Sequence, residues 1–444
     1  ENFWIYRINP RSANCRIRAR ACRGLDGNKS PPQGIDLMSK TAFITTSIPY
    51  VNAAPHIGHA LEFVQADVIA RSLALYGADV FLLTGTDDNA LKNVIAAEAA
   101  GVTPQQWVDK HAENFKELAK ALQIAHDDFI RTSRDARHID GAKKLWESCD
   151  KKDIYKKKYK GIYCVGCEEF KAGADLVNGA RRAPACPAGR LAELECPEHP
   201  GKKPEVVEEE NYFFRLSRYQ AQLEQLIASD KLRIIPESRK NEILEFIRGG
   251  LFDFSISRSR ERTKGWGIPV PGDPTQTMYV WFDALSNYIN ALGYAEDGEK
   301  FQKYWAKGDE IIHVIGKGIN RFHAVYWPAM LLSAKVRLPS TIFVHGYLTV
   351  DGQKMSKTIG NVVDPVAMIK KFGVDPLRYF LLREYSPAED GDYSESKLIA
   401  RYNADLANGL GNLVARVTTL AAARGVLKLV AGEDVEKEVD TKIT

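Results

Sequence analysis

The stretch TAFITTSIPYVNAAPHIGHALEFVQADVIARSLALYGADVFLLTGTDD, residues 41–88, decides the fold. Its first part, 41–51, is rich in apolar and β-branched residues, which is typical of a buried strand. A turn with Pro, His and Gly then leads into a helical pattern over 60–77, which Gly77 closes, and 79–88 has the composition of a second strand. The stretch therefore predicts a βαβ unit, with two parallel strands joined by a right-handed crossover.

The rest of the chain first continues this alternation and then interrupts it. Helical periodicity occupies 104–123 and 135–149. From 151 the composition changes: Lys, Tyr, Cys and Gly become frequent, and there is little periodicity. Strand and helix patterns resume near 250, in TMYVWFDALSNYINALG (277–293), EIIHVIGKG (310–318), a helix over 321–334 and STIFVHGYLTV (340–350). We therefore expect an α/β fold whose parallel sheet is split by an insertion.

Charge and cysteine content limit the possible functions. The 444 residues carry a formal net charge of +4, and residues 1–38, with seven basic and three acidic side chains, account for that excess. A neutral body gives no argument for DNA binding, and no apolar run approaches the ~18 residues that span a membrane. Four of the seven cysteines lie between 164 and 196, which favours a metal site in a reducing compartment. We expect a soluble, cytoplasmic protein.

Residues 1–38 are irregular and rich in Arg, and they end in SPPQGIDLMSK around Met38. Three interpretations stay open: an upstream read-through or cloning-derived segment before a natural start at Met38, a transit peptide, or an ordinary extension of the domain. The first is favoured because strand-like sequence begins directly at Thr41. We expect this extension to lie outside the fold.

Two histidines lie at the turn between the first expected strand and the helix that follows it. In an open parallel sheet, ligands bind beyond the carboxyl ends of the strands, where a helix N-terminus offers free N–H groups. His56 and His59 lie near the first helical turn, and Gly58 removes a side chain where a flat ring could approach. Such a pair can donate to phosphate oxygens. Taken alone, it is more often two half-exposed histidines at a helix start.

A second motif, DGQKMSKTIGN at 351–361, carries Lys354 and Lys357 on either side of Met355 and Ser356. Point charges on a loop suit a leaving pyrophosphate, whose negative charge grows in the transition state. A lysine loop by itself is usually solvated surface. Both motifs in this order, on opposite halves of a split sheet, favour a nucleotide site.

The motifs HIGH and KMSKT resemble the two signatures of class I aminoacyl-tRNA synthetases. The surrounding sequence resembles the methionyl-tRNA synthetase family of bacterial type from about residue 40 to the end of the chain. The matching segments are IPYVNAAPHIGHAL, VFLLTGTDD, YCVGCEEF, YVWFDALSNYI, HVIGKGINRFHAVYWPAML and FVHGYLTVDGQKMSK. The resemblance implies a Rossmann-like catalytic domain that condenses methionine with ATP, as its Mg²⁺ complex, and then transfers the methionyl group to tRNA(Met).

Two rival functions are weighed against this one. The first is another class I synthetase. Against it, leucine, isoleucine and valine synthetases carry a much larger editing insertion, and the cysteine enzyme would hold its metal in the amino-acid pocket. The other rival is a catalytically weak paralogue that serves as an RNA-binding or scaffold module, which the intact histidines and lysines argue against.

The resemblance also implies roles for individual residues. The catalytic residues would be His56, His59, Lys354 and Lys357. The ATP site would comprise His56, Gly58, His59, Lys317, Lys354, Met355 and Lys357. The methionine site would comprise Ser47, Ile48, Tyr50, Asp87, Trp281, Ala284, Leu285, Tyr288, Ile319 and His323. Asp87 is the expected partner of the methionine ammonium group, and the apolar and aromatic members suit a polarisable thioether.

The chain departs from the family pattern at three places. Asn89 and Ala90 stand where the family commonly has His and Gly, and Gly318 stands where it has an Asp expected near the ribose. Thr358 replaces the usual final Ser of the lysine loop, which is a mild change. These departures bear on ATP affinity more than on the reaction.

The cysteine cluster predicts a structural zinc knuckle. Cys164 and Cys167 form one pair with x₂ spacing, and Cys196 and His199 form the second, which would close a tetrahedral site. The segment between the pairs is long and contains Cys186, which could compete as a ligand. A metal-free knuckle stays open as the alternative.

These observations predict six regions. They are an N-terminal extension (1–38), a first Rossmann half (39–150), an inserted connective domain with the knuckle (151–245), a second Rossmann half (246–345), a lysine-loop and stem-contact region (346–393) and the beginning of an α-helical anticodon-binding bundle (394–444). Some twenty residues follow the helix at 405–422, so we expect that bundle to be truncated and tRNA charging to be poorer than methionine activation.

Overall fold

The computed structural model of this protein describes residues 40–164, 169–171, 177–178, 181–182, 195–196, 203–355 and 360–424. Several predictions fall on other residues. The extension 1–38, the zinc ligands Cys167 and His199, and Lys357 of the lysine loop lie outside the described residues.

A six-stranded parallel sheet forms the centre of the molecule, in the order β3-β2-β1-β14-β15-β9. Its strands are β1 (Thr41–Thr46), β2 (Asp79–Thr86), β3 (Asp128–Arg131), β9 (Arg233–Ile235), β14 (Glu310–Gly316) and β15 (Thr341–His345). From the β1–β14 pair, β2 and β3 follow outward on one side and β15 on the other, so the strand order reverses at that pair. Ligands of open α/β sheets bind at the carboxyl ends of such strands. The predicted split parallel sheet is confirmed.

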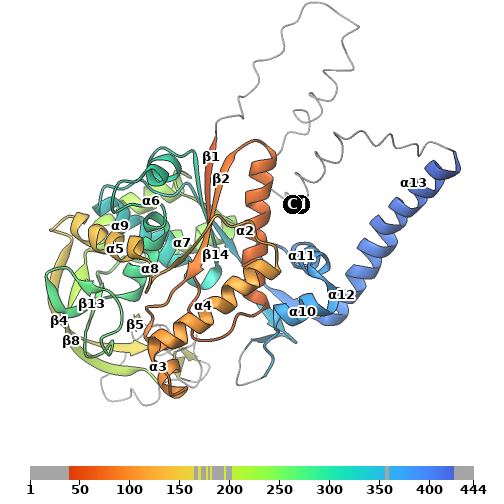
Figure 1. Ribbon diagram of the computed structural model, residues 1–444. Coiled ribbons are helices and arrows are strands. Elements are labelled where there is room, and N and C mark those ends of the chain that lie inside the picture. The colour runs from red at the N-terminus through yellow and green to blue at the C-terminus, as the bar shows by residue number, and fades with distance from the viewer. Residues whose placement is uncertain are drawn as a thin grey trace, which may run out of the picture. The chain divides into compact units, whose positions relative to one another are not determined.

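Helices cover both faces of this sheet (Figure 1). They include α2 (Ile57–Leu75), α3 (Leu91–Ala99), α4 (Pro104–Ala121), α5 (Ala136–Ser148), α6 (Gln220–Ala228), α7 (Glu237–Arg248), α8 (Val280–Asn290) and α9 (Trp327–Ser333). Alternation along β1 sends Phe43 into the core shared with α8 and α9, and Ile44 into the core shared with α2 and α4. Both side chains are fully buried, which explains why this strand lacks polar alternation.

Smaller sheets form around the predicted insertion. One has the order β10-β8-β4-β5 and another the order β11-β13-β12. Their strands are β4 (Ile154–Cys164), β5 (Glu169–Lys171), β8 (Glu205–Phe214), β10 (Phe254–Ser255), β11 (Ser257–Ser259), β12 (Pro269–Val270) and β13 (Asp273–Met278). The pair β6 (Val177–Asn178) and β7 (Arg181–Arg182) makes a third.

Two strand partners differ from the sequence expectation. β9 lies inside the range 151–245 expected for the insertion, yet it pairs in parallel with β15 of the central sheet. Conversely β10, expected in the second Rossmann half, pairs with β8 of the insertion. Periodicity predicts that a segment is a strand but carries no information about its partner, so both differences concern pairing.

The C-terminal region combines a small sheet with helices. The sheet has the order β17-β16-β18, and the helices follow it along the chain. These elements are β16 (Leu348–Val350), β17 (Gln353–Lys354), α10 (Pro365–Phe372), α11 (Val374–Arg383), β18 (Gly391–Tyr393), α12 (Glu395–Arg401), a π-helical segment (Tyr402–Gly411) and α13 (Asn412–Ala423). The helix expected from 394 is therefore present. None of the helices in the described ranges is both long enough and apolar enough to cross a bilayer.

Candidate active site

His56 is the N-cap of α2, and His59 lies in its first turn. The N–H of Gly58 donates to His56 Nδ1 (3.1 Å), and the N–H of His56 donates to His59 Nδ1 (3.1 Å). A neutral imidazole whose Nδ1 accepts a hydrogen bond carries its proton on Nε2. The two rings, stacked at 3.9 Å, therefore each keep an Nε2–H as a donor at the helix N-terminus.

Burial keeps both rings neutral. It lowers the pKa of His56 to about 4, and it lowers the pKa of His59 well below its usual range, with the nearby His56 and His345 adding to the effect. An anion at this position would be held by N–H donors and by the helix dipole, without full positive charges from the histidines.

The lysine-loop segment lies against the histidine turn. A Cβ added at Gly58 would come within 3.6 Å of the terminal methyl of Met355 and within 2.9 Å of His56 Cε1. The N–H of Ile57 also donates to the carbonyl of Val363 (3.0 Å). The structure thus brings the two predicted motifs together, although of Lys354 only the backbone, in β17, is described.

Aromatic side chains predicted for the methionine site form a cluster, called here the aromatic cluster. Trp281 stacks on Phe322 at 3.7 Å with nearly parallel planes, and Tyr50 meets Trp281 edge-on at 6.3 Å. Ala284 and Leu285 of α8, which also carries Trp281, are buried. Phe322 was missed from the sequence, where its only signal was its place next to His323.

Tyr288 and His323 form a buried pair within hydrogen-bond distance. Because His323 Nδ1 faces the carbonyl of Ile319 (3.0 Å), it carries the proton, and Nε2 accepts from the Tyr288 hydroxyl (2.7 Å). Burial lowers the pKa of His323 to about 4 and raises that of Tyr288. Both groups are neutral at pH 7. Ile48 and Ile319 pack against the same core.

The ends of β1 and β2 carry the predicted polar residues of the site. Asp87 is 2% exposed, forms a parallel bridge with Tyr50, and accepts from the N–H of Asn89 at Oδ1 (3.1 Å). Ser47 donates its N–H (2.7 Å) and its hydroxyl (2.6 Å) to Glu62 Oε1. The predicted members Ser47, Tyr50 and Asp87 are thus at the carboxyl edge of the sheet.

Glu62 and His345 are two site residues that the sequence reasoning missed. His345 Nε2 lies 2.9 Å from Glu62 Oε2, and its Nδ1 lies 2.7 Å from the carbonyl of Gly346. Both ring nitrogens of His345 thus face oxygen atoms, and Nε2 is the one that faces the Glu62 carboxylate. The spacing of Glu62 three residues after His59 placed it on the same helix face, which was the available signal.

The departure at Gly318 has a structural counterpart in Tyr347. A Cβ at Gly318 would lie 1.8 Å from the Tyr347 hydroxyl oxygen, so a larger residue needs Tyr347 to move. Lys317, an expected ATP-site residue, pairs with Asp390 (2.5 Å) and lies 4.9 Å from the centre of the Tyr347 ring. A carboxylate therefore does lie beside Lys317, but it comes from Asp390.

Two of the four predicted zinc ligands are described. Cys164 and Cys196 are both buried. Within the part of the chain that the structure covers, no group of three or more His, Cys, Asp or Glu side chains is placed to hold a metal ion.

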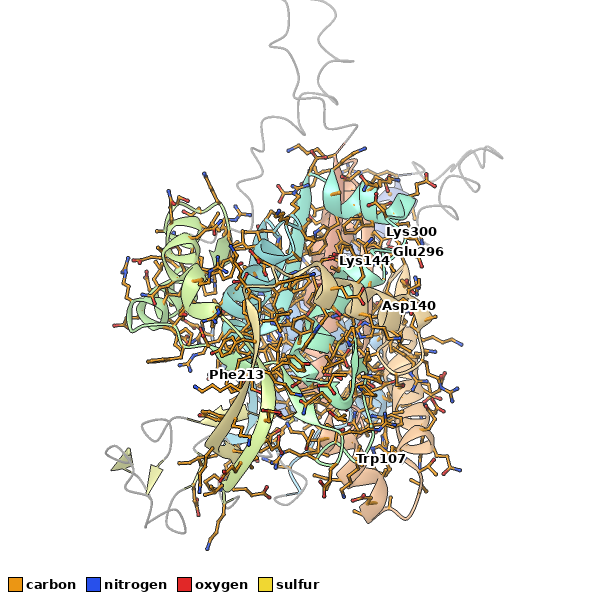
Figure 2. The ribbon with its side chains drawn as sticks, turned by 90° about the vertical axis from the view of Figure 1, so that its left-hand side faces the viewer. Trp107, Asp140, Lys144, Phe213, Glu296 and Lys300 are labelled. Carbon is orange, nitrogen blue, oxygen red and sulfur yellow. The ribbon has the colours of Figure 1, made fainter. Side chains whose placement is uncertain are left out.

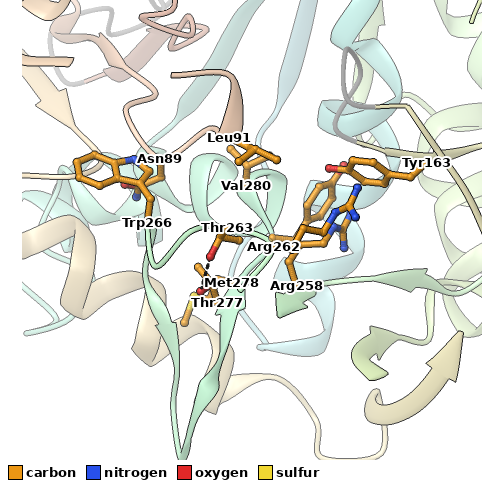
Figure 3. A pocket seen from close by; sticks show the side chains of 11 residues that line it. Asn89, Leu91, Tyr163, Arg258, Arg262, Thr263, Trp266, Thr277, Met278 and Val280 are labelled. Carbon is orange, nitrogen blue, oxygen red and sulfur yellow. Dashed lines mark hydrogen bonds between the residues drawn. The ribbon is translucent and has the colours of Figure 1, made fainter. Parts of the chain in front are cut away.

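A recess lined in part by Tyr163, the residue before Cys164, was not predicted from the sequence (Figure 3). Its lining residues are Asn89, Leu91, Tyr163, Arg258, Arg262, Thr263, Trp266, Thr277, Met278, Tyr279 and Val280. Arg262 lies 4.2 Å over the ring of Tyr163, and Arg258 lies 4.2 Å over the ring of Tyr279. The first of these cation–π contacts joins the insertion to the segment that precedes α8, and the second lies within that segment.

Comparison with known proteins places these features in a family. The family model described as tRNA synthetases class I (M) matches residues 42–418. Among curated proteins, the chain is 46% identical to a methionine–tRNA ligase of Fusobacterium nucleatum over 85% of this chain and 57% of that one, and 46% identical to one of Synechocystis over 86% and 69%.

Solved structures agree with the sequence comparison. Mycobacterium tuberculosis methionyl-tRNA synthetase in complex with methionyl-adenylate superposes with a TM-score of 0.78 at 43% identity, over 86% of this chain and 72% of that one. The share of a curated relative's own length that this chain covers ranges from 57% to 70%. With the histidine motif at the carboxyl edge of a split parallel sheet and Met355 of the second motif beside it, the chain belongs to the methionyl-tRNA synthetases, a family of class I tRNA synthetases.

Proposed function

We propose that this chain is a methionine–tRNA ligase, which converts L-methionine and ATP to methionyl-adenylate and then charges tRNA(Met). The single observation that carries the proposal is a juxtaposition. Two neutral histidine donors at the N-terminus of α2 lie at the same sheet edge as Asp87 and Tyr50, and Tyr50 in turn contacts Trp281 of the aromatic cluster.

The first step asks for positioning and charge stabilisation. A methionine carboxylate oxygen attacks the α-phosphorus of ATP, the bond to the bridging oxygen breaks, and pyrophosphate leaves with the bonding electrons. His56 and His59 would donate Nε2–H bonds to phosphate oxygens, and Lys354 and Lys357 would hold the pyrophosphate. Mg²⁺ bound with ATP would supply further neutralisation of charge.

The amino acid would be held at the other side of the reacting phosphorus. Asp87 would face the ammonium group, because a buried carboxylate at the sheet edge suits a cation. The aromatic cluster, with Tyr288 and His323, would surround the thioether. In the second step a ribose hydroxyl of the terminal adenosine of tRNA attacks the acyl carbon, and AMP leaves.

We also infer that the inserted domain binds one structural Zn²⁺ through Cys164, Cys167, Cys196 and His199. Two observations support the fit: the donor set is the Cys₃His type that zinc prefers, and its two described members are buried. The ion would clamp a segment that borders the recess, since Tyr163 of that recess precedes Cys164.

Amino-acid-dependent exchange of pyrophosphate into ATP tests the proposed function. We expect exchange with methionine and at least about a hundredfold less with leucine, isoleucine or cysteine. Lys357→Ala should slow exchange about tenfold or more, equivalent to about 1.4 kcal/mol, with the methionine Kd unchanged. The exposed Lys370 of α10 supplies the matched control, Lys370→Ala. Absence of exchange with every amino acid would instead favour an RNA-binding or scaffold role.

A further inference from the structure

A buried polar network connects α5, α8 and the segment after β2. Asp283, in the first turn of α8, is 1% exposed. Its Oδ1 lies 2.5 Å from His138 Nε2, and its Oδ2 accepts from Asn89 Nδ2 at 2.7 Å. Within the described ranges, no Lys or Arg lies at ion-pair distance from Asp283. The carboxylate is therefore held by an imidazole, an amide and the positive end of the α8 dipole.

The two ring nitrogens of His138 face different partners. Nδ1 lies 3.3 Å from Asn290 Nδ2, which also lies within hydrogen-bond distance of the His138 carbonyl (3.2 Å) and of Ser286 Oγ (2.8 Å). Nε2 faces a carboxylate oxygen at 2.5 Å, so it is the ring nitrogen that donates to Asp283. Both His138 and Asn89 are thus donors, and Asp283 accepts from both as a carboxylate.

The network ends at the residue proposed to bind the methionine ammonium group. The side-chain amide of Asn89 donates to Asp283, and the backbone N–H of Asn89 donates to Asp87 Oδ1 (3.1 Å). The side chain of Asn93 donates to the Asp87 carbonyl (3.0 Å) from the other side. The orientation of the Asp87 carboxylate is therefore coupled to Asp283 through one residue, Asn89.

We propose that Asn89, Asp283 and His138 are positioning residues for methionine activation, which set the Asp87 carboxylate for the substrate ammonium group. This inference rests on the proposed function. Asn89 is one of the positions where the chain departs from the family pattern, and its amide suits this place because it offers N–H donors that do not titrate. Breaking the link should weaken methionine use selectively, because none of the three residues lies in the proposed phosphate site.

An exchange of side chains between positions 89 and 283 tests the inference. Asn89→Asp places two carboxylates together, and Asp283→Asn removes the charge that the Asn89 amide binds. Each single variant should raise the KM for methionine about tenfold and leave the KM for ATP within about twofold. The double variant N89D/D283N restores one donor and one acceptor across the contact, and the introduced amide oxygen still accepts from His138, while the longer bond from Asn89 Nδ2 to the Thr132 carbonyl (3.3 Å) is lost. It should return the methionine KM to within about threefold of the unchanged protein.

Controls separate positioning from folding and from the proposed function itself. Asn114→Ala, which removes a 3.4 Å contact to His111 on α4, should leave both KM values unchanged. A double variant no better than the single ones, or equal effects on the two KM values, would overturn the inference. If the unchanged chain showed no exchange, the proposed function would fail, and the methionine Kd of the same variants by calorimetry would still decide whether the network orients Asp87.

Discussion

At the residue scale, the histidines of the site differ in what their ring nitrogens face. His313 donates from Nδ1 to Thr45 Oγ1 (2.8 Å), because its Nε2 accepts from the indole of Trp327 (3.3 Å). Burial lowers its pKa well below the usual range, as it does for His56 and His323. These rings are neutral hydrogen-bonding groups, whereas His345 Nε2 faces the Glu62 carboxylate at 2.9 Å.

The lowered pKa values predict how stability depends on pH. The folded pKa of His323 is about 4, below the ordinary value of 6.5, so the unfolded chain binds more protons between these two values. This contribution to stability is fully present above pH 6.5 and is lost as pH falls toward 4. It amounts to on the order of 3 kcal/mol for one buried group.

Urea unfolding at several pH values measures this effect. His323→Gln removes the titrating group and keeps an acceptor for Tyr288, so the loss of unfolding free energy between pH 6.5 and 4.5 should be smaller in this variant. Parallel curves for the variant and the unchanged protein would contradict the assignment of a neutral, buried His323.

Gly318 and Tyr347 make a second prediction at this scale. Gly318→Asp would restore the carboxylate of the family pattern, but its Cβ would collide with the Tyr347 hydroxyl, 1.8 Å away. We expect the single variant to lose about 1–3 kcal/mol of stability or to raise the KM for ATP. Tyr347→Phe removes the colliding oxygen and should recover part of the loss in the double variant. A Gly318→Asp protein that folds and binds ATP as before would show that Tyr347 moves freely.

At the element scale, the contact between α5 and α8 holds the network of His138 and Asp283 together. A Cβ at Gly141 of α5 would lie 2.0 Å from Asn290 Oδ1 of α8, so only glycine permits this approach. Lys144 of α5 also donates to the carbonyls of Tyr294 and Ala295 (2.9 Å each), beside Glu296 (Figure 2).

Gly141→Ala should therefore separate the two helices. We expect a loss of about 1–3 kcal/mol in unfolding free energy and a higher KM for methionine, because His138 would move away from Asp283. Asp140→Ala, an exposed position on the same helix, is the matched control. An unchanged unfolding free energy in Gly141→Ala would show that α8 can move away from α5 without loss of stability.

The proposed zinc site makes a prediction about the inserted domain. Metal analysis should find about one zinc per chain, and Cys164→Ala should release it and lower the stability of the insertion. Cys149 provides the control: its thiol is buried, its pKa is raised to about 12 by burial, and it lies outside the knuckle, so Cys149→Ala should keep the zinc. A protein purified without zinc would favour the metal-free alternative.

The elements also show what sequence patterns can and cannot predict. Buried, apolar β1 and β14 were predictable because parallel strands covered on both faces have continuous apolar runs. The short strand β9 was not predictable as a neighbour of β15, because three residues carry no register information. For Glu62 the sequence offered its spacing from His59, but its contact with His345, and that of Tyr347 with Gly318, were not predictable because these partners lie far away along the chain.

At the scale of the whole molecule, the site is assembled from both halves of the split sheet. The histidine turn follows β1, Asp87 follows β2, and Lys317 follows β14, so the two strands at the point of reversal and their neighbour β2 each place a residue at one edge. The motifs made this edge predictable because their identities imply a nucleotide, and the parallel sheet requires that they meet. The coupling of α5 and α8 to Asp87 was not predictable from the sequence, because it depends on contacts between residues far apart in the chain.

Formation of methionyl-adenylate by this chain is the decisive measurement of the proposed activity. The chain is mixed with ATP, Mg²⁺ and an equimolar mixture of methionine, leucine, isoleucine and cysteine, and the bound product is identified by mass spectrometry. We predict that methionyl-adenylate accumulates to about one per chain, with one pyrophosphate released for each, and that no other adenylate forms. A different aminoacyl-adenylate, or none at all from a folded chain, would contradict the account.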